Sequence, residues 1–415
     1  MSTRKAYVPN LPRMQRTLEA LSSSDVGGTA GGGVDRPALS DADKAVRDLF
    51  ASMLKERGLE VRVDEVGSMY GRRAGTEPDA DPVLVGSHLD TVSPGGRFDG
   101  ILGVVAALEA VQLLDELGIR TRRPIDVVSW TGEEGARFPP AMLASGVVAG
   151  EYGADFVYSR SDPLGRTFGE ELSRIGYQGD AASRPARIHA SLELHIEQGT
   201  RLEDLDVPVG VVSGVDPVRW YEVTVQGRGE HAGGPGLRHR RDSVVAASRM
   251  IVAARDIAVA DERFTSTVGI VSAAPGSTNV VANTTTFSLD MRAHTDAGLD
   301  DALGSLQQAF HGIANEERVG LRVEETWRLP ATTFDPALRS QLMRAAAEDG
   351  ITATELTGTI GHDSLHLSKV TRAAMLFTPT VNGLSHCEAE DTPWVASEQA
   401  VAVLTRVLSE VADEA

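Results

Sequence analysis

The chain is organised around the stretch Gly86-Ser-His-Leu-Asp-Thr-Val-Ser-Pro-Gly-Gly-Arg-Phe-Asp-Gly100. The apolar run Pro82–Gly86 before it is typical of a buried strand, and Ile101–Leu114 after it has the apolar spacing of a helix. The polar residues of the stretch therefore follow the end of a strand. In open α/β sheets ligands usually bind at this edge, because rigid elements hold its loops.

Three side chains of this stretch are candidate metal ligands: His88, Asp90 and Asp99. Divalent ions are commonly bound by imidazole and carboxylate groups. The alternative is that these side chains only cap a turn and a helix, since Asp is common near helix starts. The stretch alone leaves both interpretations open.

Composition indicates the class of protein. A chain of 415 residues is long for one hydrophobic core, so we expect two domains. With 41% hydrophobic and 24% charged residues, it is an ordinary globular protein rather than a disordered one. A net charge of −19 has the wrong sign for binding nucleic acid or an anionic membrane, and we expect neither partner.

The single cysteine, Cys387, excludes an internal disulfide. The first residues lack the apolar core of a secretion signal, and no apolar run reaches the ~18 residues that span a bilayer. We therefore expect a cytoplasmic protein.

Strands alternate with helices through much of the chain. Strands are predicted at Val61–Val66, Pro82–Gly86, Ile125–Ser129, Ala190–His195 and Ala373–Thr378. This alternation is typical of an α/β domain, with a mixed sheet flanked by helices.

A second pattern begins near Val212 and has the order strand, helix, strand, strand, helix, strand. Its segments are Tyr221–Gln226, Asp242–Val259, Thr265–Ala273, Thr284–Arg292, Asp300–Arg318 and Leu321–Trp327. This is the order of a ferredoxin-like α+β sandwich. We expect a main domain of residues 1–212 and 329–415, interrupted by an inserted domain of residues 213–328.

The motif Trp130-Thr-Gly-Glu-Glu-Gly-Ala-Arg137 also follows a predicted strand and places two adjacent carboxylates, Glu133 and Glu134, at the sheet edge. One can bind a metal while the other accepts a proton from water. Alone, the motif could also be an acid-rich helix N-terminus.

Two further histidines complete a candidate metal centre. His195 ends a predicted strand, and His386 lies in a glycine-bounded loop rich in acids. Either would be a weak signal alone, but together with the residues above they form a ligand set for two divalent ions. The set is His88, Asp99, Glu134, His195 and His386, with Asp99 bridging and Glu133 free as the base. Two ions ~3.5–4 Å apart can activate water and polarise a carbonyl. Nitrogen and oxygen ligands suit zinc, manganese, cobalt or nickel.

These motifs resemble those of the bimetallic aminoacylase and carboxypeptidase superfamily, whose catalytic domain is metallopeptidase-like. The greatest similarity is to its hydantoinase/carbamoylase branch, which includes N-carbamoyl-L-amino acid hydrolases, β-ureidopropionases and allantoate amidohydrolases. The most specific motifs are Glu133-Glu-Gly-Ala-Arg-Phe138 and His195-Ile-Glu-Gln-Gly199. The resemblance covers nearly the whole chain.

The resemblance implies roles for several residues. Glu133 would be the general base, and the Asp90 carboxylate would orient His88. The inserted domain would be both a lid and the dimerisation surface of a homodimer. His231 would reach the partner's active site and stabilise the developing oxyanion, whereas the residues alone suggest a surface histidine.

The substrate would be a small carboxylate. By resemblance, Asn279 and Arg292 would hold its carboxylate group, a task that suits the planar fork of arginine. Gln198 would also contact the substrate. Without the resemblance, Arg292 would be taken for a surface salt bridge.

The chain departs from the family pattern at Ala232-Gly-Gly-Pro-Gly-Leu237, at Cys387 and at Thr357-Gly-Thr-Ile-Gly-His362. None of these departures removes a metal ligand, and we expect His362 and His366 to be structural or supporting groups. The predicted reaction is hydrolysis of a linear C–N bond in an N-carbamoyl-L-amino acid. The alternatives are allantoate, an N-acyl amino acid or a dipeptide as substrate, and a binding protein on a hydrolase scaffold.

Overall fold

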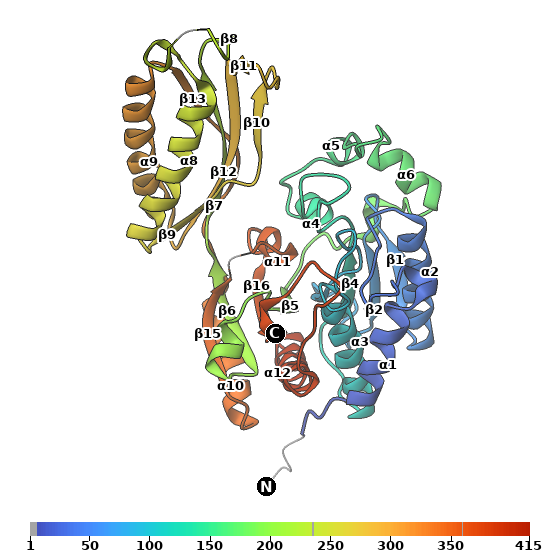
Figure 1. Ribbon diagram of the computed structural model, residues 1–415. Helices are drawn as coiled ribbons and strands as arrows, with labels where there is room; N and C mark the ends of the chain where they lie inside the picture. The colour runs from blue at the N-terminus through green and yellow to red at the C-terminus, as the bar shows by residue number, and fades with distance from the viewer. Residues whose placement is uncertain (1–5, 235, 359) are drawn as a thin grey trace. The chain divides into compact units, whose positions relative to one another are not determined.

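The computed structural model describes residues 6–234, 236–358 and 360–415, and it divides into two compact units (Figure 1). Unit 1 runs to Ser213 and resumes at Thr333, and unit 2 is Gly214–Thr332. The two units are described separately below.

Unit 1 is built on a mixed sheet that has nine strands among the described residues, in the order β1-β2-β4-β3-β5-β16-β6-β14, with β15 paired to β6. Strands β4, β3, β5 and β16 are parallel to one another, whereas β1, β2 and β6 pair antiparallel with their neighbours. The predicted mixed sheet is confirmed. Its strands are β1 Glu60–Val63, β2 Met69–Arg73, β3 Val83–His88, β4 Ile125–Trp130, β5 Ala190–Ile196, β6 Val209–Val215, β14 Thr332–Thr333, β15 Ala353–Gly358 and β16 Arg372–Thr378.

Two largely buried helices cover the centre of this sheet. Helix α3 (Ile101–Glu116) is buried on nearly all sides, as expected for a helix that is apolar all round. It packs on β3, β4 and β5 and on α12 (Trp394–Ala412), which also contacts β5 and β16. The other helices are α1 Leu11–Leu21, α2 Asp41–Glu56, α4 Leu143–Val148, α5 Ala154–Tyr158, α6 Phe168–Ile175, α7 Arg201–Leu205, α10 Pro336–Glu348 and α11 Asp363–Leu367.

Unit 2 has an antiparallel sheet of order β10-β12-β7-β13, with β9 paired to β12. Helices α8 (Ser243–Ala260) and α9 (Asp296–Glu317) pack on each other and on this sheet, around a core that includes Phe287 and Phe310. The order of elements is that of the predicted ferredoxin-like sandwich. The strands are β7 Val218–Gln226, β9 Phe264–Thr267, β10 Val271–Ala274, β12 Thr284–Ala293 and β13 Gly320–Leu329, with a separate ribbon of β8 Glu230–His231 and β11 Val280–Val281.

Two predicted strands differ in the structure. The segment Thr265–Ala273 is not one strand but parts of β9 and β10, because the backbone N–H groups of Gly269 and Ile270 donate to the Ser288 hydroxyl, at 3.3 and 3.0 Å, instead of continuing the ladder. The strand predicted to reach Val66 ends at Val63. There the Asp64 side chain accepts hydrogen bonds from the backbone N–H groups of Val66 and Ser68 and forms a turn into β2.

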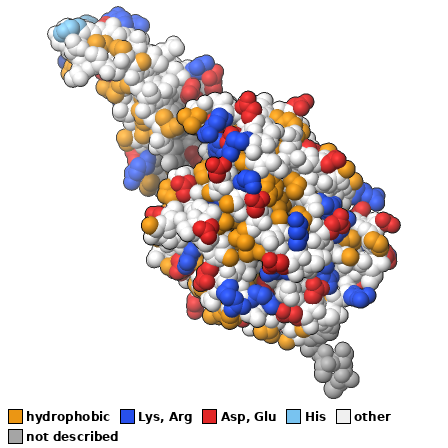
Figure 2. All heavy atoms as spheres, turned by 90° about the vertical axis from the view of Figure 1, so that its right-hand side faces the viewer, with side chains coloured by type: hydrophobic (Ala, Val, Ile, Leu, Met, Phe, Trp, Pro, Cys, Tyr) orange, Lys and Arg blue, Asp and Glu red, His pale blue; other side chains and the backbone are white. Residues whose placement is uncertain are grey.

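None of the helices in the described part of the chain has the length and apolar character that a membrane span requires. In the view of Figure 2, acidic and basic side chains are interspersed over the surface.

Candidate metal centre and catalytic site

The parallel strands of unit 1 bring the candidate ligands to one edge of the sheet. His88 is the last residue of β3, and His195 is the last but one of β5. Glu134 follows β4, and His386 follows β16. Because parallel strands end at the same edge, side chains from four distant segments meet there, together with Asp99 just before α3.

Asp99 lies between two groups of donor atoms. Its Oδ1 is 3.5 Å from Nε2 of His88 and 3.1 Å from Nε2 of His195. Its Oδ2 is 3.1 Å from Nε2 of His386, which in turn is 3.4 Å from Oε2 of Glu134. Within each group, His88–Asp99–His195 and Asp99–Glu134–His386, the donor atoms all lie within 4.8 Å of one another. The two groups share Asp99 and could hold one cation each.

The histidine tautomers fit metal binding. Nδ1 of His88 donates to the Asp90 carbonyl at 2.9 Å, and Nδ1 of His195 donates to the Ile196 carbonyl at 3.0 Å. In the neutral form of each ring, Nε2 therefore carries the lone pair, and it faces Asp99. Nε2 of His88 is buried and has no hydrogen-bond partner among the described residues. Imidazole lone pairs beside carboxylate oxygens are a suitable ligand set for a divalent transition metal.

The backbone around the donors adopts uncommon conformations. Gly100 has a φ of +65°, and a Cβ there would lie 2.4 Å from the His88 ring. Gln198 and His386 have φ values of +58° and +57°, in the left-handed region that non-glycine residues rarely adopt. Such conformations persist where the surrounding contacts hold them, often at functional sites.

The ionisable groups of the cluster lie close enough to shift one another's pKa. Burial disfavours the charged form of Asp99, but the neighbouring imidazoles of His195, His386 and His88 outweigh it and hold the Asp99 pKa well below its usual value. The hydrogen bond with Asp99 raises the pKa of His386 to about 9. Burial and the nearby Asp99 raise the pKa of Glu134 to about 7. Crowded carboxylates of this kind are stabilised by a cation placed among them.

Glu133 lies beside the first group but belongs to neither of the two groups found among the described residues. Its Oε2 is 3.5 Å from Nε2 of His88, and its Oε1 is 3.9 Å from Nδ1 of His362. Only 6% of the residue is exposed, and burial raises its pKa well above the usual value for glutamate. A carboxylate with a raised pKa is suited to accept and return a proton.

Asp90 acts differently from the expectation. It is the backbone carbonyl of Asp90, not its carboxylate, that contacts His88. The carboxylate instead accepts hydrogen bonds from the backbone N–H groups of Gly132, Glu133 and Glu134, at 3.2, 3.3 and 3.3 Å. Asp90 thus supports both the first histidine and the loop that carries the two glutamates.

Gln198 joins the same cluster. Its amide nitrogen donates to Oδ2 of Asp99 at 2.8 Å and to the Ser385 hydroxyl at 3.0 Å, while its buried Oε1 has no partner in the part of the chain that the structure describes. The role of Gln198 in substrate binding stays a prediction.

Several further residues surround the site, and of these only His362 was a candidate from the sequence. His362 is buried, with its ring 4.1 Å from the ring of His195, and burial lowers its pKa well below the usual value. Glu193 accepts hydrogen bonds from the side chains of Ser87 and Ser364 below the site. Glu390 contacts the Asp99 loop. The sequence shows that Glu390 lies in the acid-rich loop after His386, but it does not indicate which groups Glu390 contacts.

Unit 2 contains the other three predicted site residues and places two of them together. His231 pairs with Val280 in the β8–β11 ribbon, and the backbone N–H of Ala232 donates to the carbonyl of the adjacent Asn279 at 2.9 Å. His231 is exposed.

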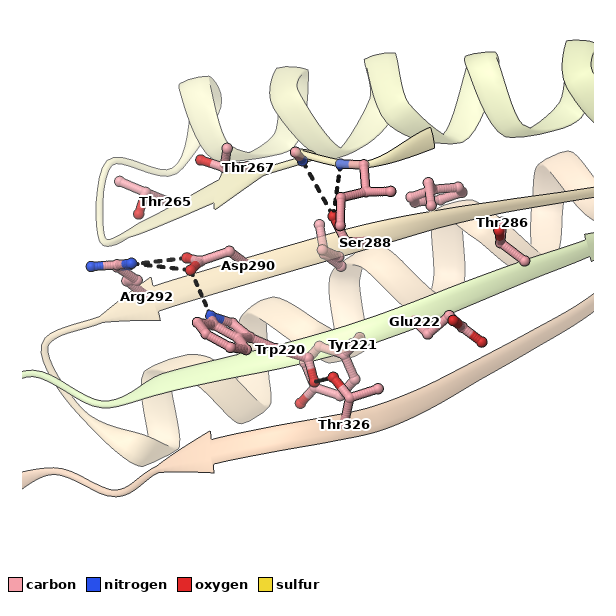
Figure 3. A pocket seen from close by; sticks show the side chains of 14 residues that line it. Trp220, Tyr221, Glu222, Thr265, Thr267, Thr286, Ser288, Asp290, Arg292 and Thr326 are labelled. Atoms are coloured by element: carbon pink, nitrogen blue, oxygen red, sulfur yellow. Dashed lines mark hydrogen bonds and ion pairs between the residues drawn. The ribbon is translucent and has the colours of Figure 1, made fainter. Parts of the chain in front are cut away.

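Arg292 lies near the C-terminal end of β12 (Figure 3), whereas the β8–β11 ribbon lies at the other end of this unit (Figure 1). It pairs with Thr265 of β9 and makes a bidentate ion pair with Asp290, at 3.0 and 3.1 Å, which also accepts from Nε1 of Trp220. At about 3.3 Å per residue, the strand from Thr284 to Arg292 spans about 26 Å. Within one copy of unit 2, Asn279 and Arg292 therefore do not meet.

Of the three places where the chain departs from the family pattern, two contain residues outside the described ones, Pro235 and Thr359. Cys387 is described, and it is partly exposed with a free thiol.

A mixed α/β sheet with two imidazole–carboxylate groups that share one aspartate, and with a separate buried glutamate beside them, has the features of a metal-dependent hydrolase. The chain belongs to peptidase family M20/M25/M40, whose model matches residues 84–411. Enzymes of this family are metal-dependent.

The similar proteins lie in the branch that the motifs indicated. An N-carbamoyl-L-amino-acid amidohydrolase of Rhizobium meliloti is 40% identical over 380 residues, which cover 91% of each chain. An allantoate amidohydrolase of Bacillus subtilis is 32% identical and covers 93% of this chain and 94% of its own. Among solved structures, an amidase of the hydantoinase/carbamoylase family from Burkholderia multivorans has a TM-score of 0.90 and 39% identity, covering 98% of this chain and 99% of its own. The resemblance drawn from the motifs is confirmed.

Proposed function

We propose that this protein is an amidohydrolase that uses two divalent metal ions and cleaves an N-carbamoyl-L-amino acid to the amino acid, carbon dioxide and ammonia. The observation that carries the proposal is the position of Asp99 between two donor groups, with Glu133 beside them. The relatives named amidohydrolases confirm the class, a hydrolase of linear C–N bonds. The name of the Rhizobium meliloti relative supports the carbamoyl substrate.

The proposed ligands are His88, Asp99 and His195 for one ion, and Asp99, Glu134 and His386 for the other. When bound, such ions polarise a carbonyl and lower the pKa of water. Glu133 accepts a proton from the attacking water and returns it to the departing nitrogen, a role that its raised pKa favours. Gln198, held by Asp99 and Ser385, presents its free amide oxygen to the nitrogen of the ureido group.

We infer that two copies of the chain contribute to each site. His231 and Asn279 lie at one end of unit 2 and Arg292 lies at the other, so all three can serve one substrate only if they come from two chains. A homodimer is also supported by α8, where Val245, Val252 and Val259 are 46%, 57% and 64% exposed. These valines follow one another at seven-residue intervals and so lie on one face of the helix.

The proposed carboxylate-binding role of Arg292 is supported by the chemistry of its side chain. Asp290 holds the guanidinium through Nε and one Nη, and the planar fork of arginine suits a substrate carboxylate. Allantoate, which also carries ureido and carboxylate groups, is the second candidate substrate, because an allantoate amidohydrolase is among the similar proteins.

The experiment is an assay of metal-reconstituted protein against a panel of substrates. Release of ammonia is measured with N-carbamoyl-α-amino acids, N-carbamoyl-β-alanine and allantoate. Release of the amine is measured with N-acetyl-amino acids. We expect turnover of N-carbamoyl-L-amino acids that is lost on chelation and restored by zinc, manganese, cobalt or nickel. Faster turnover of allantoate than of N-carbamoyl-L-amino acids would identify allantoate as the preferred substrate. Hydrolysis of N-acetyl substrates alone, or no turnover with metal bound, would refute the proposal.

A further inference from the structure

Glu390 is a buried carboxylate that no role above explains. It lies four residues after His386, in the loop that connects β16 to α12, and it is 3% exposed. Burial of a carboxylate is costly unless hydrogen bonds compensate for the lost water, so its partners indicate what it holds.

Those partners belong to two segments that are far apart in the sequence. Oε1 of Glu390 accepts hydrogen bonds from the backbone N–H groups of Phe98, at 2.8 Å, and of Asp99, at 3.0 Å. Oε2 accepts from the Ser385 hydroxyl at 2.8 Å. One carboxylate thus connects the backbone of the shared aspartate with the residue just before His386.

The Asp99 loop is shaped around this carboxylate. A Cβ on Gly96 would lie 2.0 Å from both Cδ and Oε1 of Glu390, so any larger residue there would displace it. Hydrogen bonds to an ionised carboxylate are among the stronger ones in proteins. These buried hydrogen bonds therefore hold the two segments together more strongly than a solvent-exposed contact would.

The second donor group depends on this link more than the first. His88 and His195 lie on central strands of the sheet, and backbone carbonyls orient both rings. His386, by contrast, lies on a loop, its side chain is 48% exposed, and its φ of +57° is unfavourable for a non-glycine residue. Its distance from Asp99 has to be maintained by neighbouring contacts.

We propose that Glu390 is a positioning residue that holds Asp99 and His386 at the separation at which the group Asp99–Glu134–His386 binds a divalent ion. The inference rests on the proposed function, because it assumes that this group binds a metal.

The test is zinc titration of the metal-free full-length protein, followed by competition with a chromophoric chelator, with cobalt absorption as a second readout. The variants are Glu390→Ala, Glu390→Asp and Glu390→Gln. Asp is one methylene shorter and cannot reach the two N–H groups, whereas Gln keeps an acceptor oxygen but no charge. Glu388→Ala is the matched control, because Glu388 lies in the same loop but is exposed and contacts Thr29 instead.

We expect the wild-type chain to bind two zinc ions. In Glu390→Ala and Glu390→Asp the weaker of the two binding steps should weaken by about 10- to 100-fold, the usual effect of removing a group that supports a ligand. The tighter step should not change, and Glu390→Gln and Glu388→Ala should behave like wild type. If circular dichroism shows that Glu390→Ala is unfolded, Glu390→Asp decides the result.

The proposal is overturned if the Ala and Asp variants bind both ions like wild type, or if they weaken both steps equally. It is also overturned if Glu390→Gln or the control Glu388→Ala loses as much zinc affinity in the weaker step as Glu390→Ala. A wild-type chain that binds fewer than two zinc ions would overturn it as well. Because this readout is metal binding, a chain that shows the expected pattern but hydrolyses no ureido substrate would refute the proposed function and leave the role of Glu390 intact.

Discussion

The backbone carbonyl of Asp90 accepts a hydrogen bond from Nδ1 of His88 at 2.9 Å, while the Asp90 carboxylate faces the loop that follows β4. One residue thus orients a candidate ligand with its backbone and the two glutamates with its side chain. Substitution of the side chain separates these effects, because the carbonyl remains.

In Asp90→Asn, one carboxylate oxygen becomes an amide nitrogen that cannot accept the N–H bonds of the Glu133–Glu134 loop. We expect kcat/KM to fall about 10- to 100-fold, as for other groups that support metal ligands. Steady-state kinetics at a fixed metal concentration measure this loss. Activity equal to that of wild type would show that the loop holds its conformation without Asp90.

In Glu133→Gln, the proposed base is removed but no proposed ligand is. We expect kcat to fall about 10²- to 10⁴-fold, the usual contribution of general acid–base catalysis, with the metal content unchanged. Elemental analysis of the same samples measures the metal. Glu134→Gln is the matched comparison, because it should lose metal as well as activity. Near-normal turnover of Glu133→Gln would assign the base to another residue.

Arg292→Ala should discriminate between substrates. If the guanidinium binds the substrate carboxylate, KM for an N-carbamoyl amino acid should rise about 10- to 100-fold, which corresponds to a charged hydrogen bond. The corresponding amino acid amide, which lacks the carboxylate, should be affected little. Arg292→Lys keeps the positive charge but not the planar fork, so its KM for the N-carbamoyl amino acid should lie between those of wild type and Arg292→Ala. An equal loss with both substrates would contradict the assignment.

Mixed dimers test whether sites are shared. His231→Ala and Glu133→Gln should each be nearly inactive alone. A heterodimer, however, should recover activity, because one of its two sites combines an intact Glu133 with an intact His231. Differently tagged chains, refolded together and purified through both tags, provide the sample. If confirmed heterodimers stay inactive, each active site belongs to a single chain.

His366 should make stability depend on pH. It is 5% exposed, and neither of its ring nitrogens has a hydrogen-bond partner within residues 6–234, 236–358 and 360–415. Burial, with a contribution from Lys369, lowers its pKa to about 4. Since this folded-state value is below the usual 6.5, the unfolded chain binds a proton first as the pH falls, and the folded state loses stability between pH 6.5 and 4.

Over that range the loss from His366 amounts to about 3 kcal/mol. In His366→Leu this contribution is absent, so the variant should become more stable relative to wild type as the pH falls. Urea unfolding at several pH values measures the difference. A difference that does not change with pH would mean that His366 is protonated in the folded protein.

The meeting of the candidate ligands at one edge of the sheet could be predicted because its signals are local. His88, Glu134 and His195 each follow or end an apolar run typical of a strand, and parallel strands place such positions at one edge. The same reasoning gave a wrong prediction where a side chain accepts backbone hydrogen bonds in place of a neighbouring strand. Ser288 interrupts the strand predicted at Thr265–Ala273, and nothing in the alternation of that segment reveals a hydroxyl that comes from another strand.

The sequence by itself determined the family, the mixed sheet and the residues that could bind metal, because motif spacing and apolar periodicity act over a few neighbouring positions. Only the tertiary structure decided which atom of Asp90 supports His88, that Glu390 links Asp99 to the loop of His386, and that Asn279 and Arg292 lie at opposite ends of unit 2. Those relationships depend on how distant segments pack, and no local pattern of residues encodes which hydrogen-bond acceptor a given donor will face.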